Sequence, residues 1–116
     1  MPQTSEIRLP AGTALTQVQA ALGKMIQDHE ILIFMKGSAM LPQCGFSAQV
    51  VEIFKRLDKD FTTCNVLENE LVRDGIKTFS NWPTLPQIFY KQKFLGGCDI
   101  VTAMYQNGEL EALLQA

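Results

Sequence analysis

Residues 31–35, ILIFM, form an uninterrupted apolar run that decides how the rest of the chain must fold. A short run of this kind is typical of a central strand that is covered on both faces. Helices are therefore expected on both sides of the sheet that contains it.

The segments that follow the run alternate between helical and extended patterns. Apolar residues recur at helical spacing in 46–57 and again from about 70 to 79, whereas residues 61–67 read as a strand. The apolar run at 31–35, the helical segment at 46–57 and the strand at 61–67 together predict a β-α-β unit.

The two ends of the chain complete the pattern. Residues 14–27 predict an amphipathic helix, residues 87–97 predict two short strands joined by a polar turn, and a last helix is expected from Asp99 to about Leu114. Residues 1–12 carry two prolines and a glycine and predict a mobile N-terminal tail before a domain at 13–116. The order of elements predicts an α/β sandwich with a four-stranded mixed sheet flanked by helices.

Composition limits the classes of partner and compartment. The 116 residues are 47% hydrophobic and 19% charged, and the formal net charge of −2 gives no broad positive surface for nucleic acid. No apolar run approaches the ~20 residues that cross a membrane, and the start lacks the pattern of a secretory signal. Three cysteines are too few for a secreted disulfide scaffold and are not spaced as a structural zinc site. A reducing, cytoplasmic compartment is expected.

One cysteine carries the candidate chemistry. In LPQCGFS, residues 41–47, Cys44 precedes a helix expected to begin near Gly45 or Phe46, where free N–H groups and the helix dipole favour a thiolate. A thiolate is a nucleophile or a metal ligand, and the alternative is a half-buried loop cysteine without chemistry. Ser47 stands where a dithiol motif has its second thiol, so an adduct on Cys44 must be resolved by an external thiol such as glutathione or by a distant cysteine.

Three stretches of the sequence together resemble the monothiol glutaredoxins of the CGFS type, in their bacterial single-domain form. The resemblance runs from about Val18 to Leu114 and is carried by MKGSAMLPQCGFSAQ (35–49), NWPTLPQIFYKQKFLGGCDIV (81–101) and MYQNGEL (104–110). It implies a thioredoxin-like fold, a non-covalently bound glutathione and a [2Fe–2S] cluster that bridges two protomers.

The implied cluster fits a site with one thiol per chain. Two irons need four terminal ligands, which are usually thiolates. Cys44 from each of two chains would supply two of them, and a glutathione beside each cysteine would supply the other two. Because half of this ligand set is diffusible, the cluster is expected to be labile and to pass to apo iron–sulfur acceptor proteins.

The resemblance also implies a glutathione site. Glutathione has two carboxylates, one amine and an extended backbone, so its site needs cations, a carboxylate and an unpaired backbone edge. In the family, the cations lie near the glycine carboxylate, a turn before a cis proline pairs with the backbone, and a helix N-terminus binds the γ-glutamyl end. The implied contacts are Lys36, Phe46, Arg73, Lys77, Thr84, Leu85, Pro86, Gly97, Cys98 and Asp99.

Structural alternatives exist for several of these contacts. Lys36, and the pair Arg73 and Lys77 spaced i, i+4, fit solvated surface charges as well, and of the pair Arg73 is the preferred contact. Asp99 fits the role of a helix N-cap, and Phe46 fits the packing of its own helix.

Other residues near the motifs have mainly structural expectations. Cys64 is expected in the core, and Trp82 is expected as a core or rim aromatic or beside the site. Cys98 is expected to lend its backbone N–H, and a disulfide with Cys44 is a further hypothesis.

Three functions are compatible with the sequence. The preferred one is a homodimeric iron–sulfur carrier in cluster assembly, transfer and iron homeostasis. The second is a glutathione-dependent oxidoreductase that removes glutathione from protein thiols through a Cys44 mixed disulfide, with weak activity expected at most. The third is an adaptor that pairs with a BolA-like protein through a shared cluster.

Overall fold

The central strand of the computed structural model, which describes residues 2–115, is the one predicted from the apolar run. Strand β2 spans Ile31–Met35, and all five of its residues are buried. Ile31, Ile33 and Met35 pack into one hydrophobic cluster, while Leu32 and Phe34 pack into another on the opposite face. The prediction of a strand covered on both faces is confirmed.

The strands form one mixed sheet in the order β1-β3-β2-β4-β5. Strand β2 pairs in parallel with β3 (Phe61–Asn65) and antiparallel with β4 (Gln87–Tyr90). Strand β5 (Lys93–Gly96) pairs antiparallel with β4 and forms one edge of the sheet. The thioredoxin-like arrangement of the predicted elements is therefore present.

The sheet has five strands, and the expected number of four was wrong. The additional strand, β1 (Thr4–Ile7), comes from the segment 1–12 that was predicted as a mobile tail. It pairs in parallel with β3, and the hydroxyls of Ser5 and Thr62 lie 2.8 Å apart. Most of β1 is exposed, so no apolar alternation in the sequence marks it as a strand. The domain boundary at residue 13 stays a prediction.

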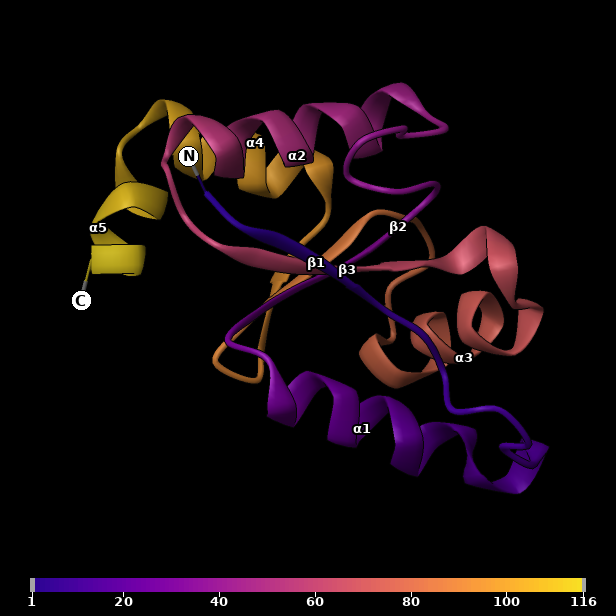
Figure 1. Cartoon of the computed structure of the whole chain (residues 1–116). Helices are drawn as coiled ribbons and strands as arrows, with labels where there is room; N and C mark the ends of the chain where they lie inside the picture. Colours follow the sequence, from indigo (N-terminus) through magenta and orange to yellow (C-terminus); the bar gives the residue numbers. More distant parts are fainter. Residues whose placement is uncertain (1, 116) are drawn as a thin grey trace.

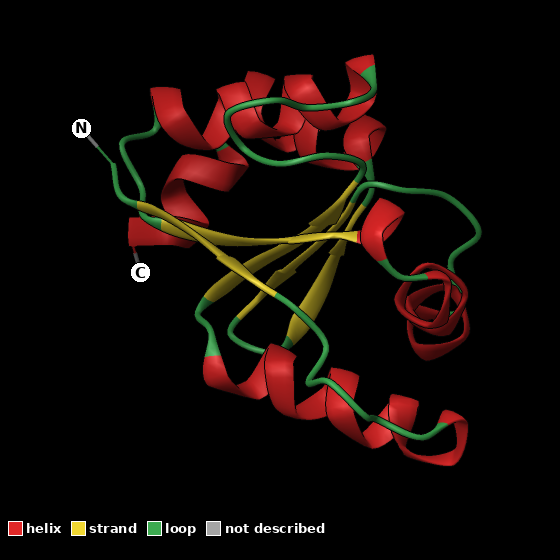
Figure 2. Ribbon diagram, turned by 45° about the vertical axis from the view of Figure 1, so that its right-hand side comes forward, coloured by secondary structure: helices red, strands yellow, loops and turns green. Residues whose placement is uncertain are grey.

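Helices cover both faces of the sheet, as Figure 1 and Figure 2 show. One face carries α1 (Val18–Asp28) and α3 (Glu70–Ser80), and the other carries α2 (Gly45–Arg56), α4 (Cys98–Gln106) and α5 (Glu109–Gln115). Two short 3₁₀ turns, Leu15–Gln17 and Val66–Glu68, precede α1 and α3. Within residues 2–115, the helices are too short or too polar to cross a membrane.

The last predicted helix is two helices. A single helix was expected from Asp99 to about Leu114, but α4 and α5 are separated at Asn107 and Gly108. Gly108 has a φ of +85°, and the Asn107 side chain accepts a hydrogen bond from the Glu109 N–H at 2.9 Å. An Asn-Gly pair therefore ends one helix and starts the next.

The contact between α1 and α3 yields a stability prediction with a built-in control. A Cβ added at Gly75 would lie 2.9 Å from Val18 Cγ1 and 3.2 Å from Leu22 Cδ1, whereas one at Gly23 would lie 3.5 Å from the Phe79 ring. We expect Gly75→Ala to lower the free energy of unfolding by about 1 kcal/mol through overpacking. Gly23→Ala should raise it by about 0.5–1 kcal/mol, because alanine favours the helix. Urea unfolding of both variants checks this, and equal effects would contradict the packing argument.

Candidate functional site

Cys44 lies at the N-terminus of α2, where the loop that leaves β2 ends. It is the N-cap residue, with extended backbone angles (φ −153°, ψ 151°), and its Sγ accepts a hydrogen bond from the Ser47 N–H at 3.4 Å. The helix begins at Gly45, as predicted. The thiol thus takes the position in which a helix N-terminus stabilises negative charge.

The fully buried Ser47 joins this thiol to the end of β2. Its Oγ accepts hydrogen bonds from the Lys36 N–H at 3.2 Å and from the Cys44 thiol at 3.4 Å. When the thiol ionises, the same hydroxyl can turn and donate to the sulfur. Ser47 therefore fixes the geometry of Cys44 as well as replacing a second thiol.

The pKa of the Cys44 thiol is below its ordinary value. Partial burial opposes ionisation, but hydrogen bonds from the Ser47 hydroxyl and from the amides of Ser47 and Phe46 outweigh it, with a further contribution from the charge of Lys36. At a given pH, a larger fraction of Cys44 is therefore thiolate than of an ordinary cysteine, which suits a nucleophile or a metal ligand.

The other two thiols are inert by comparison. Cys64 is buried in the core, as predicted, and burial, with the charges of Glu68 and Glu6, raises its pKa to about 12. Burial also raises the pKa of Cys98, whose Sγ lies 3.8 Å from Thr102 Oγ1. All three cysteines are free, so the disulfide between Cys98 and Cys44 stays a prediction.

A pocket of about 400 Å³ opens beside the N-termini of α2 and α4. Its walls come from the end of β2, the first turns of α2 and α4, the last turns of α3 and the loop before β4. The lining residues are Lys36, Phe46, Lys77, Trp82, Pro83, Thr84, Leu85, Gly97, Cys98, Asp99 and Ile100. Most of the contacts implied by the sequence therefore meet at one place.

Two of the implied contacts lie outside this lining. The Arg73 guanidinium is 3.7 Å from Glu70 Oε1 and 3.6 Å from Asp74 Oδ1, while Lys77, one turn further on, faces the pocket. Pro86 is buried, and it follows Leu85 through a cis peptide bond, as the family resemblance implies. The preference for Arg73 over Lys77 has no support from this geometry.

Two structural alternatives are wrong. Asp99 is the second residue of α4, and the N-cap is Gly97, so Asp99 is not a cap. Phe46 is 61% exposed and lines the pocket, so it does not serve the packing of its own helix. Both side chains are available to a ligand.

The pocket carries charge that the protein does not neutralise. Lys36, Lys77 and Asp99 all line it. Among the described residues, none forms an ion pair or a side-chain hydrogen bond with any of these three groups. The site thus presents two cations and one carboxylate to whatever enters it.

A buried glutamine, Gln87, holds the loop before β4, which forms one wall of the pocket. Gln87 Nε2 donates to the carbonyl oxygens of Trp82 at 3.0 Å and Thr84 at 3.2 Å. A Cβ at Gly97 would lie 3.1 Å from the Trp82 indole nitrogen, so glycine lets the two walls approach this closely without crowding.

Sequence reasoning missed the positioning roles of Ser47 and Gln87 and the lining residues Pro83 and Ile100. Signals for the first two were present. Ser47 lies three residues after the N-cap cysteine, where cap hydrogen bonds form, and Gln87 is a polar residue in an otherwise apolar strand.

Comparisons with known proteins show the family of the chain. The glutaredoxin family model matches residues 31–95. The chain is 44% identical to the chloroplastic monothiol glutaredoxin-S7 of Oryza sativa, covering 90% of this chain and 62% of that protein. It is 42% identical to an uncharacterized monothiol glutaredoxin ycf64-like of Synechocystis, covering 85% of this chain and 92% of that one.

Solved structures show the same fold. The solution structure of reduced poplar apo GrxS14 superposes with a TM-score of 0.77 at 46% identity, covering 88% of this chain and 94% of that one. A buckwheat glutaredoxin–glutathione complex gives a TM-score of 0.77 at 20% identity, covering 91% of this chain and 94% of that one, which supports the fold alone.

The contacts of Cys44 predict how its reactivity depends on pH. Because iodoacetamide reacts with the thiolate, the rate should rise with pH and level off at a lower pH than for an ordinary cysteine. Ser47→Ala removes a hydrogen bond to the thiolate, so the profile should move to higher pH and the rate at neutral pH should fall about threefold. Ser5→Ala, which loses a hydroxyl contact on β1, is the control and should leave the profile in place. An unchanged profile in Ser47→Ala would contradict the role given to this hydroxyl.

Proposed function

The chain belongs to the monothiol glutaredoxins of the CGFS type, and from this we propose that it binds glutathione in the pocket beside Cys44 and carries a [2Fe–2S] cluster shared by two copies of the chain. The observation that carries the proposal is the unneutralised charge on the pocket beside a thiol of lowered pKa. Each part of glutathione has a counterpart there.

The charges of the pocket complement those of glutathione. Lys36 and Lys77 suit the glycine carboxylate, and Asp99 suits the ammonium group of the γ-glutamyl end. The first N–H groups of α4, which begins at Cys98, suit the γ-glutamyl carboxylate. Two cations and a helix N-terminus would meet two carboxylates, and one carboxylate would meet one amine.

The middle of the tripeptide needs a backbone partner. Leu85 lines the pocket, and within residues 2–115 its N–H and C=O make no backbone hydrogen bond. An extended peptide could pair with these groups as an added strand does. The glutathione thiol would then lie toward Cys44.

The thiols of the chain fit a shared cluster that is the cargo of the protein. Cys44 favours the thiolate that iron requires, whereas the pKa values of Cys64 and Cys98 are raised. The described residues contain no group of three or more His, Cys, Asp or Glu side chains arranged to hold a metal ion. The proposal therefore takes the remaining ligands from a second chain and from two glutathione molecules.

Exposed apolar side chains flank Cys44 in the sequence and would suit a second copy. Met40 is 86% exposed, Leu41 is 70% exposed, and Phe46, two residues after the cysteine, is 61% exposed. Exposed apolar side chains favour burial against a protein surface, which would keep water from the cluster. In the cytoplasmic setting that we propose, apo acceptor proteins or a BolA-like protein would replace the second copy when the cluster is passed on.

The second candidate function is removal of glutathione from protein thiols. The Cys44 thiolate would attack the glutathione sulfur of a mixed disulfide, release the protein thiolate and become glutathionylated itself. A second glutathione thiolate would then attack the glutathione sulfur of this adduct, form glutathione disulfide and restore the Cys44 thiolate. The lowered pKa of Cys44 favours this function.

Reconstitution tests the cluster proposal. Protein supplied anaerobically with ferrous salt, sulfide and glutathione should turn brown, double its mass and hold two irons per dimer. Cys44→Ser should stay colourless and monomeric, whereas Cys64→Ser, which removes a buried core thiol, should still bind the cluster. Retention of the cluster by Cys44→Ser would refute the proposed ligand.

Titration with glutathione tests the pocket. Lys77→Gln removes an unneutralised cation from the lining, and we expect glutathione to bind about threefold to tenfold more weakly. Arg73→Gln, on the same helix but paired with Glu70 and Asp74, should have a smaller effect. Calorimetry at two salt concentrations measures both variants. If Arg73→Gln weakens binding more than Lys77→Gln does, the placement of Lys77 in the site is wrong.

A further inference from the structure

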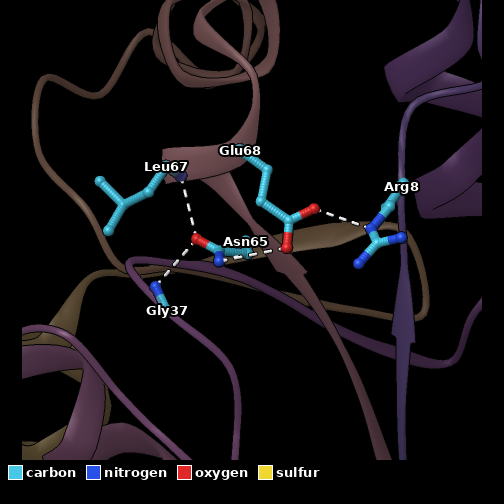
Figure 3. A network of polar contacts seen from close by, with 5 residues as sticks. All are labelled: Arg8, Gly37, Asn65, Leu67 and Glu68. Atoms are coloured by element: carbon cyan, nitrogen blue, oxygen red, sulfur yellow. Dashed lines mark hydrogen bonds and ion pairs between the residues drawn. The ribbon is translucent and has the colours of Figure 1, made fainter.

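Asn65 lies at the point where the ladder between β2 and β3 ends. It is the last residue of β3 and is paired with Met35, the last residue of β2. Its side-chain Oδ1 accepts hydrogen bonds from the Gly37 N–H at 2.9 Å and from the Leu67 N–H at 3.0 Å (Figure 3). The Asn65 side chain thus continues the hydrogen bonding of the ladder and holds the chain at Gly37, two residues beyond the end of β2.

The orientation of the Asn65 amide is fixed by charged neighbours. Its Nδ2 donates to Glu68 Oε1 at 3.4 Å, and Glu68 Oε2 lies 2.7 Å from Arg8 Nε, just beyond β1 (Figure 3). Two N–H donors face the amide oxygen, and a carboxylate faces the amide nitrogen. The oxygen therefore points to Gly37.

Gly37 opens the loop that leads to Cys44. It has a φ of +93°, and a Cβ there would lie 2.5 Å from the Leu41 carbonyl oxygen and 2.6 Å from the Gln43 nitrogen. The loop closes on itself through a hydrogen bond from the Gln43 N–H to the Lys36 carbonyl oxygen at 2.8 Å. The position of Gly37 therefore determines how the loop and Lys36 meet the pocket.

Two side chains hold consecutive amides at this point. Ser47 Oγ accepts from the Lys36 N–H and Asn65 Oδ1 accepts from the Gly37 N–H. With both amides fixed, the backbone from which the Lys36 side chain departs has little freedom. Without Asn65, the hydrogen bonds of Lys36 to Ser47 and Gln43 would remain, but the Gly37 amide would lose its acceptor.

We propose that Asn65 is a positioning residue of the glutathione site: by holding the Gly37 amide, it sets the loop 37–43 and directs the Lys36 side chain into the pocket. The inference rests on the proposed binding of glutathione for its functional effect. The structural part, the fixing of Gly37, is independent of any ligand.

Asn65→Ala tests the inference against a matched control. Asn107 makes the same local contacts, since its Oδ1 accepts from the N–H two residues on and its Nδ2 donates to a glutamate. Within residues 2–115, its side chain makes no hydrogen bond to a distant loop. In Asn65→Ala, the Gly37 amide should exchange with solvent about tenfold faster, and glutathione should bind about threefold to tenfold more weakly. Asn107→Ala should change neither quantity by more than about twofold.

A rescue variant separates positioning from a general loss of stability. In N65D/E68Q, one carboxylate oxygen at position 65 can still accept from the Gly37 N–H. The other can accept from the side-chain amide introduced at position 68, so the hydrogen bond between positions 65 and 68 remains with donor and acceptor exchanged. It should restore slow exchange of Gly37 and the affinity for glutathione to within about twofold of the wild type. Failure to restore either one would refute the proposal.

The remaining outcomes are also decisive. If wild-type protein does not bind glutathione, the proposed function fails. The exchange rate of the Gly37 amide then still tests whether Asn65 holds that amide. If it binds glutathione, and Asn65→Ala leaves both the affinity and the exchange rate unchanged, the inference fails. If Asn65→Ala does not fold, amide exchange in the wild-type protein tests the hydrogen bond between Gly37 and Asn65. The Gly37 amide should then exchange more slowly than the amide of the exposed residue Met40, and equal rates would refute the proposed role of Asn65.

Discussion

The burial of β2 on both faces determines where the polar groups of the site can lie. A strand with five buried residues has no place for charge until it ends, so Lys36 is the first polar side chain after it. Because β3 runs parallel to β2, the chain must then cross back over one face of the sheet through α2, and Cys44 lies at the N-terminus of that helix. The same physical requirement that forms the core thus brings a cation and a thiol together at one end of the sheet.

The site combines a rigid frame with unneutralised charge. Ser47 and Asn65 accept hydrogen bonds from the adjacent amides of Lys36 and Gly37, and Gln87 donates to the carbonyl oxygens of Trp82 and Thr84, so two stretches of backbone around the pocket are fixed. Within residues 2–115, the charged groups that line the pocket have no ion-pair partner, which favours a ligand of complementary charge. Rigid walls with free charges allow binding without prior rearrangement of the pocket.

The sequence predicted what depends on periodicity and local motifs. The central strand, the start of α2 and the core position of Cys64 all follow from patterns within a few residues, and the resemblance placed most of the pocket lining. The sequence did not predict β1, because this edge strand is mostly exposed and has no alternating apolar residues. Its formation depends on pairing with β3. The i, i+4 spacing also could not show which of Arg73 and Lys77 lines the pocket, because both lie on one helix face. In the structure, Arg73 is near the carboxylates of Glu70 and Asp74, whereas Lys77 lines the pocket. The role of Asn65 depends on a contact with a residue 28 positions away, which no local pattern reveals.

Strand β1 also has a consequence for how the molecule avoids self-association. Without it, β3 would present a row of free amides and carbonyls along an edge that is rich in buried residues, which is a template for pairing with another copy. The polar side chains of β1 instead face water and make a poor template. An edge strand with exposed polar side chains therefore makes pairing of another copy along this edge of the sheet less favourable.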